Sequence, residues 1–212
     1  MKIIVERREI LKHNPCEDGL DWFNDLAKTQ GRKHSIVIRG ALGLLWLYSD
    51  EKSRDYASWA QSRGLLPALN ATRADLHGTN LRNANLRGAD FQYAYLEGTN
   101  LIGADLRGVN LRGANLGGAD LYLANLGGAD LQNANLVGTN LQYTNLVGAN
   151  LESANLHCAY LQGAILQYAN LVAANLESAN LRGTNLEGAC RKEWNDPIPG
   201  WKVVNGCLTR ET

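Results

Sequence analysis

Neither sign of charge is in excess in this sequence of 212 residues, because 21 Lys and Arg side chains balance 21 Asp and Glu side chains. A general nucleic-acid-binding protein would carry a basic excess, and a strongly acidic protein would carry the opposite imbalance. The chain is long enough for one or two domains, each with a hydrophobic core. Composition therefore indicates an ordinary folded protein rather than a polyelectrolyte.

Long apolar segments are also missing. The longest, IVIRGALGLLWLY, runs for about a dozen residues and contains Arg39, which is too short to cross a bilayer. The first ten residues, MKIIVERREI, have three apolar residues before charge returns, so we expect no signal peptide. These features predict neither a membrane-spanning nor a secreted protein.

Cysteine is scarce, and its spacing forms no recognisable pattern. The four cysteines are Cys16, Cys158, Cys190 and Cys207. Their separations fit neither a zinc-binding motif nor a disulfide framework. Thiols without such a framework are typical of a reducing compartment, so we predict a cytoplasmic location.

Composition divides the chain into three regions: residues 1–70, 71–190 and 191–212. We predict that the first is a mostly α-helical N-terminal capping region, with helices in residues 16–31, 35–50 and 49–64; the second of these would start at Ser35. The first twelve residues are ambiguous between strand and helix. In the third region, Asn205-Gly206 lies between two β-prone arms, which predicts a β-hairpin cap.

The middle region is an internal repeat with a period of five. From residue 76 to 186 every fifth residue is Leu, except for Phe91, and two places earlier stands Ala, Thr or Val109. The position just before each of these Leu residues holds Asn or Asp, except at Tyr95, Tyr160, Ile165 and, after the last of them, Cys190. Repeats of this kind indicate a solenoid.

A period of five suits a short extended piece followed by a turn. Alternate residues of an extended piece share a face, so the small residue and the Leu point inward and the Asn or Asp points outward. A type II turn that begins at the Leu needs φ > 0 at its third residue. Gly stands there in thirteen of the twenty-three repeats and Asn in two more, Asn83 and Asn133. Each pentapeptide therefore supplies one side of a coil and its corner.

This A-(N/D)-L-x-x pattern strongly resembles the pentapeptide-repeat protein family. The resemblance covers the middle region and implies a mainly β fold: a right-handed quadrilateral parallel β-helix in which four pentapeptides make one coil. About six coils would then stack at roughly 4.8 Å each. Solenoid ends need caps, and the first and third regions are the candidates, with Trp194 and Trp201 expected over the last Leu layer.

A coil of four pentapeptides turns the sequence into a surface map, because equivalent side chains of successive coils stack in columns. Apolar side chains gather beside one corner, and we take them as the candidate partner-binding site: Ile102, Tyr122, Leu123, Tyr143 and Tyr160. Contiguous exposed aromatic area marks interfaces. The alternative is that these side chains only stabilise their cross-strand neighbours.

The charged side chains of the repeat also follow an order. Arg82, Arg87, Arg107 and Arg112 occupy corners in the early coils, and Glu152, Glu177 and Glu187 occupy them in the late coils. Arg87 and Arg107 share a column near Asp90 and Asp105, which leaves two interpretations, an anion site or a lattice of opposite charges. No residues converge as a catalytic site would require, and His77 and His157 lie too far apart to share a metal. We therefore expect no enzyme, cofactor, metal or small-molecule substrate.

Three functions remain open. The first is a non-enzymatic scaffold that binds a protein partner, or a second copy, through its faces or end caps. The second follows from the resemblance, since quinolone-resistance members of the family are viewed as DNA-shaped rods that bind DNA gyrase. Residues 73–190 hold nine acids against six Arg, far fewer than the roughly one charge per 1.7 Å of duplex DNA. In the third, the N-terminal region is the active module and the solenoid is a spacer.

Overall fold

The computed structural model describes residues 2–6, 35–39, 69–191 and 197–211. The chain forms two compact units, Met1–Leu69 and Asn70–Thr212. No helix among the described residues is long and apolar enough to cross a membrane.

In the first unit, strand β1 (Lys2–Glu6) pairs antiparallel with strand β2 (Ser35–Arg39), and Ile4 lies opposite Val37. The helix predicted to start at Ser35 is therefore wrong over the length of β2. Residues 36–38 are β-branched, which disfavours a helix and suits a strand, and β1 supplies a β-branched partner. The other helices predicted for residues 7–34 and 40–68 lie outside the described residues.

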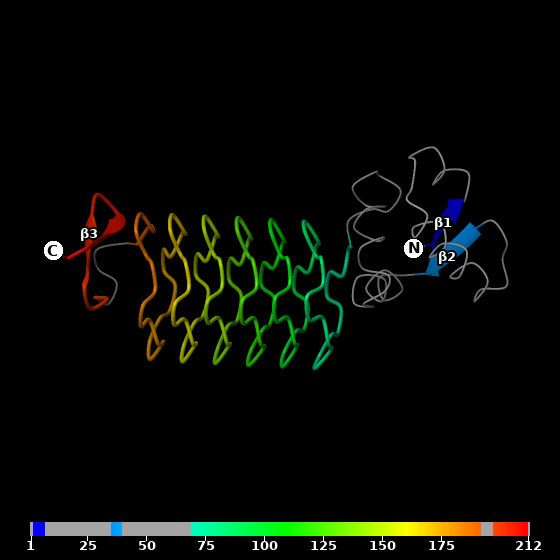
Figure 1. The fold of residues 1–212 in the computed structure, drawn as a ribbon, viewed down its shortest axis with the longest axis horizontal. Coiled ribbons are helices and arrows are strands. Elements are labelled where there is room, and N and C mark those ends of the chain that lie inside the picture. The colour runs from blue at the N-terminus through cyan, green and yellow to red at the C-terminus, as the bar shows by residue number, and fades with distance from the viewer. Residues whose placement is uncertain (1, 7–34, 40–68, 192–196, 212) are drawn as a thin grey trace. The chain divides into compact units, whose positions relative to one another are not determined.

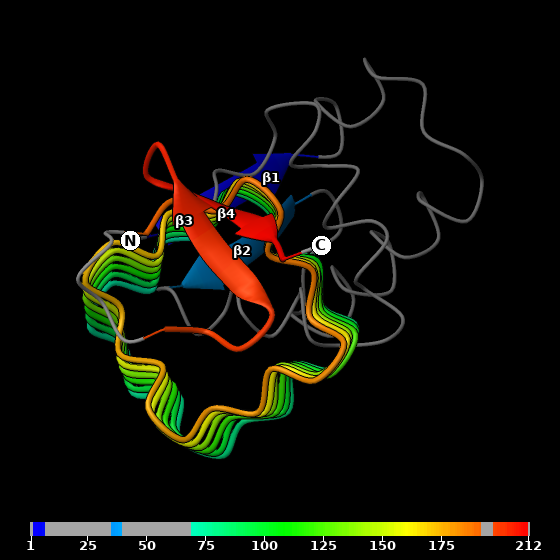
Figure 2. The ribbon, with the colours of Figure 1, turned by 90° about the vertical axis from the view of Figure 1, so that its left-hand side faces the viewer.

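The second unit begins with the solenoid. Parallel backbone bridges join each outward residue to its equivalent in the next coil, from Asn70↔Asp90 to Asn170↔Cys190. The coils lie side by side along the solenoid (Figure 1), and seen end-on they superimpose on one four-sided outline (Figure 2). The coil of four pentapeptides, which the family resemblance implies, is confirmed by this register.

Each pentapeptide closes on itself and on the next coil. The Leu81 carbonyl accepts a hydrogen bond from the Ala84 amide at 3.0 Å, and the Leu81 amide donates to the Asn100 carbonyl of the next coil at 2.7 Å. We call the two residues after each core Leu the first and second corner residues. The second corner residue has a positive φ throughout the repeat, for example 65° at Gly103, as the predicted turn requires.

The inward positions form the core. The core Leu side chains of the middle coils are at most 2 % exposed, and the small residue two places earlier is buried beside them. Four of the five inward Thr also donate a hydrogen bond to a core Leu carbonyl of the preceding coil, as Thr139 does to Leu116 at 2.9 Å. These Thr residues thereby satisfy a hydroxyl that would be costly to bury unpaired.

The Asn or Asp that precedes each core Leu points outward but remains bound to the backbone. The Asp120 carboxylate accepts a hydrogen bond from the Tyr122 amide at 3.1 Å, and the Asn140 side chain of the next coil donates to the same oxygen at 2.9 Å. Most Asn and Asp of the repeat form the first kind of bond, and several form both. A short side chain with an acceptor oxygen satisfies the corner amide and links neighbouring coils.

The C-terminal hairpin is confirmed. Strands β3 (Trp201–Val204) and β4 (Cys207–Arg210) pair antiparallel around Asn205 and Gly206, whose φ values are 52° and 77°, as expected for this turn. The hairpin extends the solenoid, because the Leu208 amide donates to the Ala189 carbonyl at 2.8 Å. Trp201 is half-buried, and Trp194 lies outside the described residues.

The core predicts how mutations distribute along the solenoid. Leu121 is 0 % exposed, so Leu121→Ala should lower the free energy of unfolding by about 2–5 kcal/mol. Leu176, in the last coil, is only half-buried, and Leu176→Ala should cost clearly less. Urea unfolding followed by circular dichroism measures both variants, and equal losses would contradict a core that weakens toward its end.

Candidate functional site

The five predicted residues lie at one corner of the solenoid and on the side of the coil that precedes this corner. We call this set the aromatic patch: Ile102, Tyr122, Leu123, Tyr143 and Tyr160. Ile102 and Tyr122 are first corner residues of successive coils, and Leu123 and Tyr143 are second corner residues. Leu123 and Tyr143 are each 56 % exposed and Tyr160 is 49 % exposed, whereas Ile102 and Tyr122 are half-buried. Three large apolar side chains are thus presented to solvent.

Part of the aromatic patch packs on itself. The Tyr122 and Tyr143 rings meet edge to face, with centroids 5.8 Å apart and planes at 88°, a favourable geometry for aromatic pairs. Among the described residues, Tyr160 makes no ring contact with either of them. Cross-strand packing therefore accounts for Tyr122 and leaves the exposed surface of Leu123, Tyr143 and Tyr160 unexplained.

Tyr143 lies against the next coil in a way that the sequence reasoning missed. A Cβ placed on Gly163, the equivalent residue of the next coil, would sit 2.6 Å from the Tyr143 ring. Tyr93 covers Gly113 and Tyr168 covers Gly188 in the same manner. The signal was present in the sequence as a second-corner Tyr followed one coil later by Gly.

The structure adds one residue beside the aromatic patch. Ile165 occupies an Asn or Asp position just beyond Gly163 and is 39 % exposed. Its bridge partner in the preceding coil is Asn145. Ile165 extends the apolar surface from the corner onto the following side of the coil.

Ion pairs elsewhere on the solenoid favour one of the two interpretations of the charges. Arg107 Nε donates to Asp105 Oδ1 at 2.7 Å, and a second bond joins Arg107 Nη2 to Asp105 Oδ2. This bond to Arg107 lowers the pKa of the Asp105 carboxyl. Arg112 pairs with Asp130 at 3.3 Å. The Arg residues at these corners therefore hold the chain's own carboxylates, which favours a lattice of opposite charges over an anion site.

The imidazole of His77 belongs to a similar network. Its Nδ1 lies 3.0 Å from Asp75 Oδ1, and its Nε2 lies 3.0 Å from Glu97 Oε2. The bond from His77 lowers the pKa of the Asp75 carboxyl. Despite these acids and imidazoles, no group of three or more metal-ligating side chains converges within the described residues.

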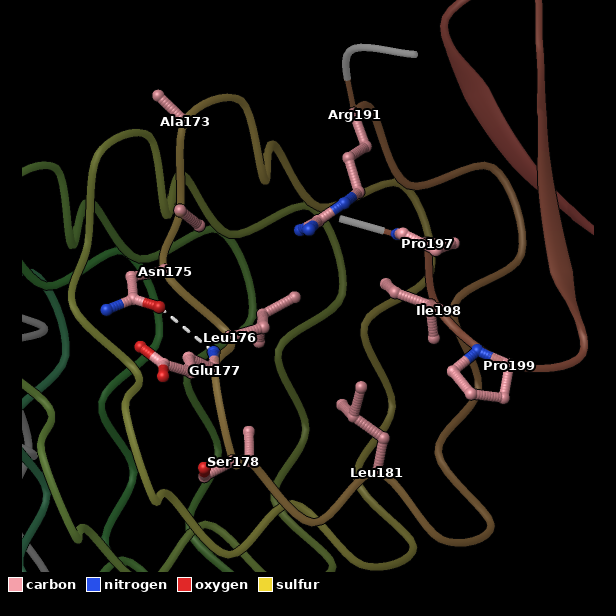
Figure 3. Close-up of a pocket in the computed structure, with 12 residues that line it drawn as sticks. Ala173, Asn175, Leu176, Glu177, Ser178, Leu181, Arg191, Pro197, Ile198 and Pro199 are labelled. Carbon is pink, nitrogen blue, oxygen red and sulfur yellow. Dashed lines mark hydrogen bonds between the residues drawn. The ribbon is translucent and has the colours of Figure 1, made fainter. Parts of the chain in front are cut away.

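A cavity of about 420 Å³ lies at the C-terminal end of the solenoid core (Figure 3). Leu176 and Leu181 of the last coil line it together with Arg191 and Ile198. Among the described residues, Glu177 and Arg191 are the only titratable side chains in its wall. It adjoins the last Leu side chains of the core, and the part of its wall that the structure describes brings together no nucleophile, base and acid.

The geometry and the repeat agree with the result of a comparison with protein families. The model of the pentapeptide repeats matches in overlapping segments, residues 72–108, 89–128, 119–157 and 154–190, which together span more than half of the chain. The chain belongs to the pentapeptide-repeat family. No curated protein matches the chain.

Several solved structures are similar to the solenoid of this pentapeptide-repeat protein. HetL from the cyanobacterium Nostoc sp. strain PCC 7120, involved in heterocyst differentiation regulation, is 34% identical over 59% of this chain and 69% of its own, with a TM-score of 0.32. A pentapeptide-repeat protein from the cyanobacterium Cyanothece 51142 is 30% identical over 60% and 93%, with a TM-score of 0.28. QnrB1, a plasmid-mediated fluoroquinolone resistance protein, is 21% identical over 55% and 66%, with a TM-score of 0.31.

Because the Tyr143 ring covers Gly163, we predict that substitution by Ala destabilises the protein more at Gly163 than at Gly148. Gly163 and Gly148 have similar φ values of 67° and 64°, but nothing lies within 4 Å of a Cβ placed on Gly148. Gly148→Ala should cost about 1–2 kcal/mol for its left-handed backbone alone. Gly163→Ala should cost more, because Tyr143 must also move. Denaturant unfolding compares the two, and equal losses would show that the Tyr143 ring contributes nothing to packing.

The Asp105–Arg107 pair predicts a pH dependence of stability. The folded pKa of Asp105 is lowered by Arg107, so the pair stabilises the fold above the unfolded pKa. That contribution is lost as pH falls from about 5 through the folded pKa. Asp105→Asn and Arg107→Gln should each flatten the decline of the melting temperature over this acid range, by a similar amount. A decline as steep as in the unmodified protein would contradict the assignment.

Proposed function

We propose that this protein is a non-enzymatic scaffold that binds another protein through the aromatic patch. The observation that carries the proposal is the exposure of Leu123, Tyr143 and Tyr160 on adjoining coils of a rigid solenoid. Elsewhere the repeat places Gly or polar side chains at most of the equivalent positions. Aromatic and aliphatic side chains held on a rigid surface bind a partner at a small entropic cost.

The charges around the aromatic patch indicate the kind of surface that a partner would need. The first corner column reads Arg82, Ile102, Tyr122, Gln142, Gln162 and Arg182, and neither corner column contains an acid. Arg82 and Arg182 therefore flank an apolar centre with positive charge at both ends. An apolar surface with acidic flanks complements this pattern best.

The same pattern disfavours a second copy as the partner at this corner. Two copies packed side by side would set Arg82 against Arg182 when antiparallel, and against another Arg82 when parallel. Like charges placed opposite each other oppose association. The partner at this corner is therefore a different protein.

Mimicry of DNA as a gyrase ligand receives less support from the surface. The nine acids of residues 73–190 are opposed by six Arg, and two of the acids, Asp105 and Asp130, are held in ion pairs. The sides of the coils are lined mainly by neutral Asn, where a DNA mimic would need a row of charges.

The double variant Tyr122→Ser with Tyr143→Ser tests the scaffold. Binding to a partner recovered with the unmodified protein should fall at least about tenfold, since truncation of interface aromatics often costs about 1.4 kcal/mol or more. Tyr168→Ser is the matched control, because Tyr168 is 68 % exposed on another corner and covers Gly188 just as Tyr143 covers Gly163. Titration by surface plasmon resonance, with circular dichroism to verify folding, gives the comparison.

Equal affinity of the double variant and the unmodified protein would remove the aromatic patch from the interface. A supercoiling assay with DNA gyrase separates the competing function. Inhibition at micromolar protein that survives the double variant would favour mimicry over the scaffold.

A further inference from the structure

Two of the cysteines that stand apart in the sequence are neighbours in the structure. Cys190 is the last outward residue of the repeat, and Cys207 begins β4; the two form an antiparallel bridge. The stretch of chain between them hid the contact from sequence reasoning. Separation along the sequence is therefore no guide to the distance between these two cysteines.

The backbone around the pair has the geometry that a disulfide needs. The Leu208 amide donates to the Ala189 carbonyl at 2.8 Å, and the Arg191 amide donates to the Gly206 carbonyl at 3.0 Å. These bonds flank the cysteines, whose own backbones do not bond to each other, so Cys190 and Cys207 form a non-hydrogen-bonded pair. The Cα atoms of such a pair lie about 4.5 Å apart, within the range of about 4.4–6.8 Å found in disulfides.

The side chains agree with the backbone. Directly opposed residues of an antiparallel pair project from the same face of the sheet, and the Cys207 side chain lies close enough to the Cys190 thiol to raise its pKa. Cys190 is exposed and Cys207 is half-buried, and both are free thiols. An oxidant in solution therefore reaches Cys190 directly, and Cys207 stands ready to react next.

We propose that Cys190 and Cys207 form a reversible disulfide that fastens the C-terminal hairpin to the last coil, with a small-molecule disulfide such as oxidised glutathione as the oxidant. The Cys190 thiolate attacks one sulfur of glutathione disulfide, which forms a mixed disulfide and releases one glutathione thiolate. The Cys207 thiolate then attacks the Cys190 sulfur and releases the second glutathione. Two protein thiols are oxidised, one glutathione disulfide is reduced to two thiols, and the two protons pass to solvent and the released thiolates.

The bond would matter because the hairpin protects an edge. Strand β4 covers the final coil near Gly188 and Ala189, and an uncovered solenoid end presents unpaired backbone groups. A disulfide closes the loop between the two cysteines and limits how far β4 can separate from the coil. Oxidation therefore locks the cap, and reduction leaves it held by hydrogen bonds and packing.

The environment of the pair also sets its reactivity. Although Cys190 is exposed as a residue, partial desolvation of its sulfur, followed by the neighbouring Cys207, raises the pKa of the Cys190 thiol above its ordinary value. Because the thiolate is the nucleophile, oxidation should be slow at neutral pH and still accelerating with pH where an ordinary thiol has levelled off.

Peptide mapping of the full chain tests the bond. The reduced protein is incubated with oxidised glutathione, alkylated and digested without reductant. We expect a cross-linked peptide pair joining Cys190 to Cys207, retained in Cys158→Ser and lost in Cys190→Ser and Cys207→Ser. The exposed Cys158 should carry only a glutathione adduct. Glutathione adducts on Cys190 and Cys207 without a cross-link between them would overturn the proposal.

Hydrogen exchange then tests the fastening of the cap. In the oxidised protein the Leu208 amide should exchange at least about tenfold more slowly than in the reduced protein, and the melting temperature should rise by about 5–10 °C. Cys158→Ser should show the same differences and Cys207→Ser should show neither. Identical exchange in both redox states would refute the fastening. These measurements need no partner protein, so their outcome is independent of the scaffold proposal.

Discussion

The backbone ladder between coils is the constraint on which the rest of the structure depends. Each outward residue bonds to the preceding coil through its own amide and carbonyl, as Asn100 donates to Thr79 and accepts from Leu81. Its chain neighbours bond to the following coil, as Leu101 donates to Asp120 and Thr99 accepts from Asp120. The ladder holds only if every coil has the same length, because a single insertion would move every later side chain to another column. Core Leu and small inward residues are therefore fixed by position, and chemical variety is confined to the corners and to the few exceptions among the Asn and Asp.

Because the repeat fixes the inward positions and leaves variation to the corners, the features of the core could be predicted from the sequence. Inward Leu, small residues and positive-φ corners follow from the burial and backbone angles that each pentapeptide imposes on itself. The helix at Ser35 was wrong because a partner distant in the chain, β1, decides the conformation of that segment. The packing of Tyr143 over Gly163 was missed because the stacking of equivalent positions shows which residues are neighbours but does not show the direction in which a side chain points.

The cysteine pair shows a different limit. Cys190 belongs to the repeat and Cys207 to the hairpin, so no column relates them, and only the docking of β4 on the last coil brings them together. Their separation in the sequence was one argument for a reducing compartment. Two free thiols placed with the backbone geometry of a disulfide suit either redox environment, and the prediction of a cytoplasmic location loses that support.

The backbone conformation of Leu123 is a second observation, independent of its exposure, that bears on the aromatic patch. Ten second corner residues of the repeat adopt a positive φ without being Gly, at a cost of about 1–2 kcal/mol each for most side chains. Asn tolerates this conformation, and each second-corner Tyr packs over a Gly of the next coil. Leu123 is the one large aliphatic member of the set; it has a φ of 58° and is 56 % exposed. Leu123 thus takes on backbone strain that a Gly would avoid while more than half of its surface stays exposed, which supports the proposal that Leu123 contacts a partner.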